Sequence, residues 1–260
     1  MAVRPAAVSG RFYPSGPVEL AALVDRLLAA VRPSGRRPLA LVAPHAGYRY
    51  CGTVAAAAYA QLTGADVGRV VVLGPAHFVP LTGCAVPSVD AFATPLGPVR
   101  LDAAARRLAA ALPGVAVDDR PHAGEHALET QLPFLLRTLG PEVRVLPVLV
   151  GRTDPAAVAG LLCALLTGPD VVAVVSTDLS HYLDRARAQE RDARTVSAVL
   201  GRDDAALRPG DACGYYPLRG LVRLAADRDL AVELLHLATS ADAGADPGRV
   251  VGYGAFLLAG

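Results

Sequence analysis

The chain has 260 residues and a formal net charge of +1, and 53% of its residues are hydrophobic and 5% aromatic. Scattered arginines and few aromatic side chains form neither the basic stripe nor the stacking platform of a nucleic-acid-binding protein. No apolar run reaches the roughly 18 residues of a membrane span, and the first residues lack the apolar centre of a signal peptide. We therefore expect a cytoplasmic protein that binds neither nucleic acid nor membranes.

Apolar patterns alternate between helix and strand along the chain. In the first half of the chain they predict a helix over residues 18–31, a strand over 38–44, a helix over 52–62 and a strand over 70–73. No clear element is predicted over 82–99, and helices follow over 102–112 and 125–139. The rest of the chain is predicted to form a strand over 144–151, a helix over 154–168, a strand over 171–178, a helix over 186–200, a helix from Leu218 and a strand over 249–259. Near-continuous apolar strands that alternate with helices are typical of an α/β fold with helices on both sheet faces. Nothing marks a boundary, so we predict one domain over residues 1–260.

Three predicted strands are followed by histidines. His45 follows the strand over 38–44 in "APHAGYRYCG", and His77 follows the strand over 70–73 in "GPAHF". The strand over 171–178 runs into "STDLSHY", which contains Asp178 and His181. The Gly-Pro pair in "GPAHF" is expected to end its strand in a tight turn. Because open α/β sheets bind ligands at the carboxyl edge of their parallel strands, we expect these imidazoles to share one pocket. Converging imidazoles indicate a metal site or acid/base catalysis.

A second cluster lies in the predicted helix over 125–139. His122, Glu125, His126 and Glu129 are close in sequence, and helical spacing would place the two glutamates on one face. The segment lacks the HExxH pattern of metalloproteases. It is either part of the pocket or a helix start with favourable acidic residues.

The four cysteines are widely spaced and contain no CxxC pair, which favours reduced thiols over disulfides or a zinc knuckle. Cys213 lies between glycine and proline turn signals in "RPGDACGYYP". This position favours a polar loop over a helix core for Cys213.

Seven segments together resemble the Memo-like family, also known as AmmeMemoRadiSam system protein B. They are "GRFYPSG", "APHAGYRYCG", "GPAHF", "EHALETQLPFL", "STDLSHY", "ACGYYP" and "VGYGAF". The resemblance spans nearly the whole chain. It implies an α/β/α sandwich with a mostly parallel or mixed sheet, similar to the class III (LigB-like) extradiol dioxygenases. It also implies an association with radical-SAM and AMMECR1-like proteins, which rests on genome context.

The resemblance further implies a set of site residues. By motif, the metal ligands would be His45, His77 and Cys213, with Asp178 and His181 as second-sphere or acid/base groups. The residues implied to line the substrate pocket are Phe12, Tyr50, Glu125 and His126. The candidates for holding the second nitrogen of each ligand imidazole are Asp178, Glu125 and Glu129.

Extradiol dioxygenases hold iron with two histidines and a carboxylate, whereas here a thiolate would replace the carboxylate. Two histidines and a cysteine suit iron or copper and also accept zinc. We therefore expect a metal-dependent oxidoreductase of an unidentified small molecule, with His181 as its acid/base group. The alternatives are a binding module, for a peptide, a partner protein or iron or copper handling, and a zinc hydrolase.

Overall fold

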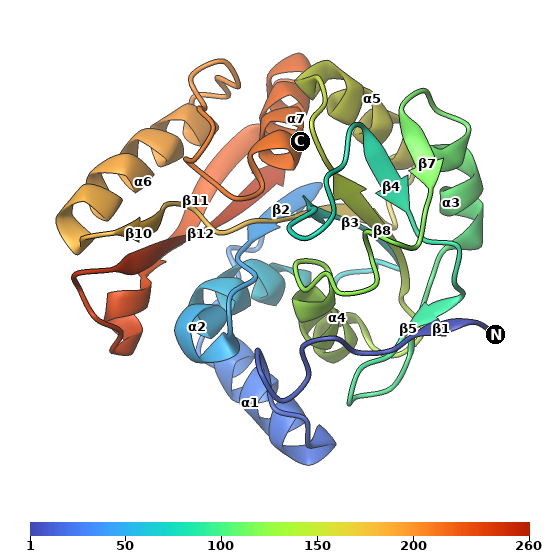
Figure 1. Cartoon of the computed structure of the whole chain (residues 1–260), viewed down its shortest axis with the longest axis horizontal. Helices are drawn as coiled ribbons and strands as arrows, with labels where there is room; N and C mark the ends of the chain where they lie inside the picture. The colour runs from blue at the N-terminus through green and yellow to red at the C-terminus, as the bar shows by residue number, and fades with distance from the viewer.

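Four parallel strands form the centre of the main sheet in the computed structural model, which describes residues 1–260 (Figure 1). In sheet order they are β2 (Ala40–Ala43), β9 (Val171–Ser176), β3 (Arg69–Pro75) and β8 (Arg144–Val150). Beyond β2 lie the antiparallel β12 (Val250–Ala259), β11 (Ala231–Thr239) and β10 (His181–Leu183). Beyond β8 lie β4 (Cys84–Val86), antiparallel to it, and β7 (Val115–Val117).

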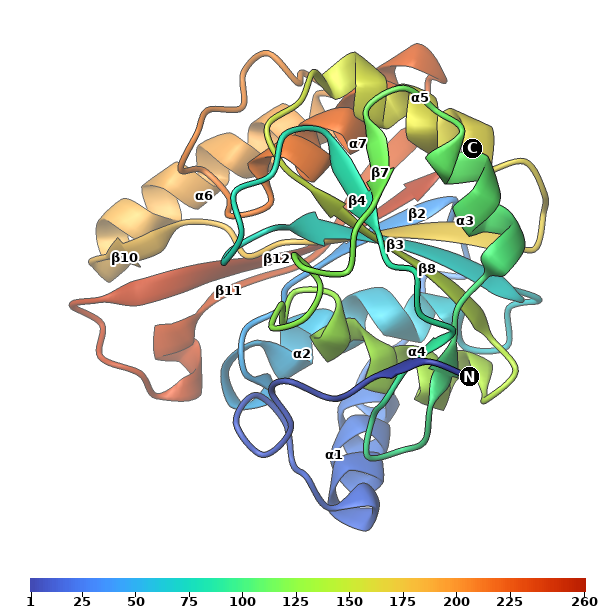
Figure 2. The ribbon, with the colours of Figure 1, turned by 45° about the vertical axis from the view of Figure 1, so that its right-hand side comes forward.

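Helices cover both faces of this sheet (Figure 2). One layer contains α1 (Pro17–Ala29), α2 (Tyr48–Tyr59) and α4 (Leu132–Leu139). The other contains α3 (Ala103–Ala110), α5 (Pro155–Leu165), α6 (Arg185–Leu200) and α7 (Tyr215–Asp227). A small second sheet joins β1 (Val3–Arg4), β5 (Ala91–Phe92) and β6 (Val99–Arg100). None of the helices combines the length and apolar character that crossing a bilayer requires.

The sheet separates two hydrophobic cores. Side chains of a strand point alternately to opposite faces, so Val70 and Val72 of β3 pack in the core of α1, α2 and α4. Val71 and Leu73 pack in the core of α5, α6 and α7. Strands that are buried on both faces explain the continuous apolar runs of the sequence. The predicted α/β/α sandwich with a mixed sheet is confirmed.

The expected turn at Gly74 and Pro75 is wrong, because β3 continues through both residues, which pair with Leu149 and Val150 of β8. On its other side β3 pairs with β9 only as far as Leu73, so the missing N–H of proline breaks no ladder there. Glycine is needed at position 74 for space: a Cβ would lie 2.8 Å from a methyl carbon of Leu128.

The predicted helix over 125–139 is also wrong at its start. The Glu125 carboxylate accepts the backbone N–H groups of His126 (2.8 Å) and Ala127 (2.9 Å), as a capping side chain does. A 3-10 turn over Glu129–Gln131 follows, and α4 begins only at Leu132. The two glutamates are therefore not neighbours on one helix face.

Candidate metal centre

The carboxyl edge of the central sheet brings three histidines together. β2 and β3 both run parallel to β9, and His45 and His77 each lie two residues beyond the end of their strand. His126 joins them from the segment that precedes α4. One ligand atom from each of the three imidazoles lies within 4.8 Å of the other two. The rings of His77 and His126 are stacked at 4.6 Å, and His45 meets both edge-on at 5.2 and 5.3 Å.

Hydrogen bonds around Ser176 fix the tautomer of His45. The Ser176 hydroxyl donates to the carbonyl oxygen of Ala127 (2.6 Å) and accepts from Gln131 Nε2 (2.9 Å). A serine hydroxyl has one proton and two lone pairs, so only a lone pair remains for His45 Nδ1 at 2.9 Å. His45 Nδ1 therefore carries the ring proton, and Nε2 keeps its lone pair.

Glu125 fixes the tautomers of the other two imidazoles. Its Oε1 lies 2.9 Å from His77 Nδ1 and 3.1 Å from His126 Nδ1. An ionised carboxylate only accepts hydrogen bonds, so both Nδ1 atoms carry a proton, and Nε2 is the nitrogen of each ring that Glu125 leaves available to an ion. The expectation that Glu125 holds the second nitrogen of an imidazole is thus confirmed, and it does so for two rings.

Burial and hydrogen bonds tune the charges of the cluster. Burial lowers the pKa of His45 to about 4, although the charge of Asp178 opposes this shift. Burial opposes ionisation of Glu125, but hydrogen bonds from His126 and His77 outweigh it and hold the pKa of its carboxyl well below the usual range. At neutral pH His45 is therefore a neutral ligand, and Glu125 is a carboxylate.

Cys213 lies beside this cluster, in the loop before α7. Its Sγ is 3.2 Å from His45 Nε2 and accepts the backbone N–H of Asp178 at 3.2 Å. The loop lies close to the segment that follows β9: a Cβ on Gly214 would lie only 2.6 Å from Cβ of Thr177. Burial, followed by the charge of Asp178, raises the pKa of the Cys213 thiol to about 12. Without a cation nearby, Cys213 is a protonated thiol.

These donors fit a metal ion. One ring nitrogen from each of three imidazoles lies within 4.8 Å of the other two, and a thiol lies against Nε2 of His45. Donors on one ion with bonds of about 2.0–2.3 Å lie about 3–4 Å apart, which matches the spacing of His45 Nε2 and Cys213 Sγ. Each imidazole also has its other nitrogen held, as metal-bound histidines do.

The remaining predicted residues have varied surroundings. Asp178 reaches the pocket, where its Oδ1 accepts the backbone N–H groups of His45 (2.8 Å) and Ala46 (3.3 Å). His181 packs on Tyr182 at 5.6 Å, with Nδ1 2.8 Å from the carbonyl oxygen of Leu179, and its acid/base role stays a prediction. Glu129 holds no imidazole, so that expectation is wrong; it forms a buried ion pair with Arg4 at 2.7 Å.

The predicted aromatic residues differ in position. The ring of Phe12 lies 4.8 Å from that of His126, and Phe12 lines a cavity of about 380 Å³ beside it. Tyr50 lies half-buried in the first turn of α2, beneath the guanidinium of Arg49 at 5.2 Å, and does not line this cavity. Of the three clustered imidazoles, only that of His126 lines this cavity.

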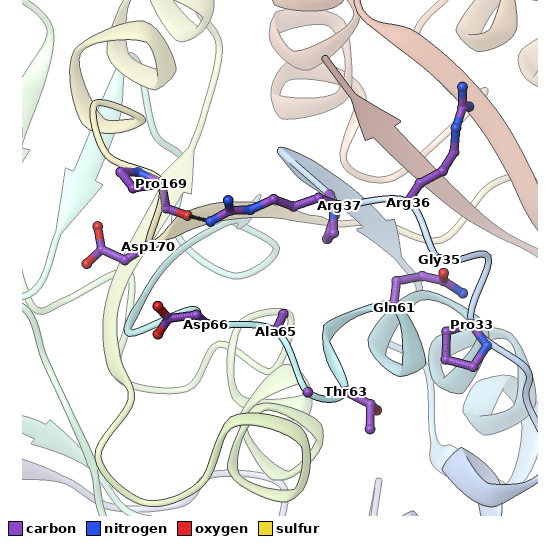
Figure 3. Close-up of a pocket in the computed structure, with 12 residues that line it drawn as sticks. Pro33, Gly35, Arg36, Arg37, Gln61, Thr63, Ala65, Asp66, Pro169 and Asp170 are labelled. Carbon is purple, nitrogen blue, oxygen red and sulfur yellow. Dashed lines mark hydrogen bonds between the residues drawn. The ribbon is translucent and has the colours of Figure 1, made fainter.

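A second hollow, of about 550 Å³, lies at the opposite edge of the sheet (Figure 3). Its walls include Arg37, Asp66 and Asp170, which come just before β2, β3 and β9. Arg37 reaches across it and donates to the carbonyl oxygen of Pro169. This hollow is at the amino ends of the strands and does not belong to the histidine cluster.

Sequence reasoning did not single out Ser176 and Gln131, and it placed His126 only in the pocket lining. All three lie within the quoted segments "STDLSHY" and "EHALETQLPFL". These two segments could therefore have drawn attention to the three residues. The contacts between the residues depend on the fold and could not be inferred from the segments.

Comparisons with known proteins agree over nearly the full length. A family model described as Memo-like protein matches residues 4–257. A MEMO1 family protein of Methanosarcina barkeri is 36% identical over 98% of this chain and 100% of its own length. Another, from Aquifex aeolicus, is 36% identical over 76% of this chain and 75% of its own length. The crystal structure of an uncharacterized Escherichia coli K12 protein is similar in fold, with a TM-score of 0.54 and 15% identity over 85% of this chain and 100% of that one.

Proposed function

Because this chain belongs to the Memo-like protein family and has a histidine cluster compatible with a metal site, we propose that it is a metal-dependent oxidoreductase that acts on a small molecule. The metal is iron or copper, held by His45, His77 and Cys213, with His126 as a further nitrogen donor. One observation carries the proposal: three imidazoles each bring one ring nitrogen within 4.8 Å of the other two, and a thiol lies against one of these imidazoles.

The donor set supports a redox-active ion. Imidazole suits iron, copper and zinc, and a thiolate adds a soft donor that favours copper(I), zinc and iron. A bound iron or copper ion supplies Lewis acidity and electron transfer. A zinc ion could occupy the same donors, but it would supply only Lewis acidity.

The chain's own residues have separate tasks in this proposal. Glu125 and Ser176 hold the ring protons on Nδ1, so that the Nε2 atoms stay free for the ion. Asp178 fixes the loop of His45 through two backbone N–H groups. The Cys213 thiol loses its proton when the ion binds. The substrate enters through the cavity at His126, and His181 carries protons.

The cysteines support a reducing cellular location. All four are free thiols, and Cys51, Cys84 and Cys213 are shielded from solvent to different degrees, whereas Cys163 is exposed. A free exposed thiol persists best in a reducing compartment. We therefore place the protein in the cytoplasm.

Metal analysis with optical spectroscopy tests the proposal. The full chain would be purified without added metal, analysed for iron, copper and zinc, and reconstituted with each ion under nitrogen before exposure to air. We expect about one iron or copper ion per chain and a thiolate-to-metal absorption band that changes in air. The band should be lost in Cys213→Ser and kept in the control Cys163→Ser, whose sulfur contacts Arg228 instead.

The opposite results identify the rivals. If neither iron nor copper binds tightly, or if Cys213→Ser keeps the band, the proposal is wrong. Zinc alone, with no response to air, supports a hydrolytic or structural site. An iron or copper ion that does not respond to oxygen or to small molecules supports metal handling.

A further inference from the structure

The cavity beside His126 has walls of uneven chemistry. It has a volume of about 380 Å³, near the lower end of the ~300–1,000 Å³ of small-molecule sites. Its lining residues come from the N-terminal segment, the loop after β3 and the segment before α4. They are Ala7, Val8, Arg11, Phe12, Phe78, Gly124 and His126.

Two phenylalanines flank His126 in this cavity. The ring of Phe12 lies 4.8 Å from the imidazole, and that of Phe78 lies 5.9 Å from it, both tilted. Phe78 is 64% exposed, although large apolar side chains are usually covered. Aromatic rings prefer tilted or offset partners at about 4.5–7 Å. The exposed face of Phe78 therefore offers a contact to a planar ring that enters the cavity.

Arg11 is the only side chain in the lining with a permanent charge. It is exposed, and its guanidinium has no acceptor or carboxylate partner in the chain. No acidic residue lines the cavity. The nearby Glu125 carboxylate is not among the lining residues and contacts the imidazoles of His77 and His126. The cavity therefore attracts an anion.

The single guanidinium also limits the charge of that anion. A planar guanidinium matches a carboxylate with two parallel hydrogen bonds. A phosphate monoester carries about −1.5 to −2 at neutral pH and would keep excess charge against one arginine. A carboxylate is balanced by Arg11 alone.

We propose that the cavity binds a small aromatic carboxylate and that this is the substrate class of the metal centre. The carboxylate pairs with Arg11, and the ring packs between Phe12 and Phe78 with its far edge toward His126. The assignment to a substrate rests on the proposed function, whereas the binding itself rests on the cavity.

Calorimetric titration of the metal-loaded and metal-free full chain with four probes tests this inference. The probes are benzoate, neutral benzamide, non-planar cyclohexanecarboxylate and acetate. We expect benzoate to bind about tenfold or more tightly than each of the others, because a charge-assisted hydrogen bond and ring packing are both lost in the controls. Arg11→Gln should weaken benzoate binding about tenfold or more and leave metal content unchanged. Arg32→Gln, at an exposed arginine outside the cavity, should bind benzoate like the natural chain.

Two results separate this inference from the proposed function. If benzoate binds no better than benzamide, or if Arg11→Gln binds it unchanged, while iron or copper remains bound and responds to air, the inference is wrong and the proposed function stands. If benzoate binds selectively through Arg11 in a chain that holds no redox-active metal, the cavity assignment stands and its place in an oxidation is wrong.

Discussion

Replacing Arg4 with methionine tests how the N-terminal segment supports the metal centre. Arg4 is 5% exposed and its partner Glu129 is fully buried, with 2.7 Å between Arg4 Nη1 and Glu129 Oε2. The same guanidinium donates to the carbonyl oxygens of His122 and Glu125, both at 2.6 Å. Methionine keeps much of the side-chain length but removes every one of these donors.

The expected loss of stability follows from this burial. Removing one partner of a buried ion pair costs about 3–5 kcal/mol, because the other charge stays buried without compensation. Glu129 keeps the backbone N–H groups of Ala7 and Val8 and the hydroxyl of Tyr13 as donors, which limits the loss. We therefore expect Arg4→Met to lower the free energy of unfolding by about 3–5 kcal/mol. Adding Glu129→Gln should recover part of it, because the buried charge is then removed.

Urea denaturation of the metal-free chain at pH 7 measures these changes. The control is Arg137→Met, which breaks an exposed pair with Asp25 at the same 2.7 Å distance. Exposed pairs contribute about 0–1 kcal/mol, so this variant should unfold almost like the natural chain. If Arg4→Met costs no more than Arg137→Met, or if Glu129→Gln worsens it further, the reasoning about the buried charge is refuted.

Two further predictions concern the surroundings of the cluster. Glu125→Gln should weaken iron or copper binding about 10–100-fold in a chelator competition, because groups that orient metal-bound imidazoles have effects of this size. The control Glu142→Gln, at an exposed position, should bind the metal like the natural chain. Equal metal affinities of the two variants would contradict the role of Glu125. Burial lowers the pKa of His122 to about 4, so the unfolded chain, with a histidine pKa of about 6.5, takes up this proton first as the pH falls. The stability contributed by neutral His122 is complete above pH 6.5, and about 2 kcal/mol of it should be lost between pH 7 and pH 5. Urea denaturation at both pH values should show a smaller loss of stability in His122→Gln than in the natural chain. Equal losses in the two proteins would count against His122 as the source of this pH dependence.

The central strands were predictable because burial on both faces leaves a simple signal. All six residues of β9 are buried, and the first five, Val171 to Val175, form a continuous apolar run in the sequence. β11 gives no such signal, because it is an edge strand whose residues are mostly half-buried or exposed. β4 and β7 have three residues each, too few for a period to show. Strand prediction therefore failed at the sheet edges and succeeded at its centre.

The site was predictable only where strand order determines it. His45 and His77 follow parallel strands, so the sheet brings them to one edge. The position of His126 depends on whether Glu125 begins a helix or binds its own following N–H groups, and both are compatible with the local sequence. The contact of Ser176 with Gln131 joins residues 45 positions apart. Neither residue type indicates such a contact by itself.

The N-terminal segment connects the two parts of the proposed site. It runs from β1 past α4 toward α1 (Figures 1 and 2), where Arg4 holds the carbonyl oxygens of the segment that contains Glu125 and His126. Farther along, Phe12 packs on the imidazole of His126. His45 and His77 stand on a rigid sheet, whereas His126 depends on contacts with a segment far away in sequence. A defect at Arg4 should therefore weaken both metal binding and the cavity, while His45 keeps its place beyond the end of β2 and Cys213 keeps its place in the loop before α7.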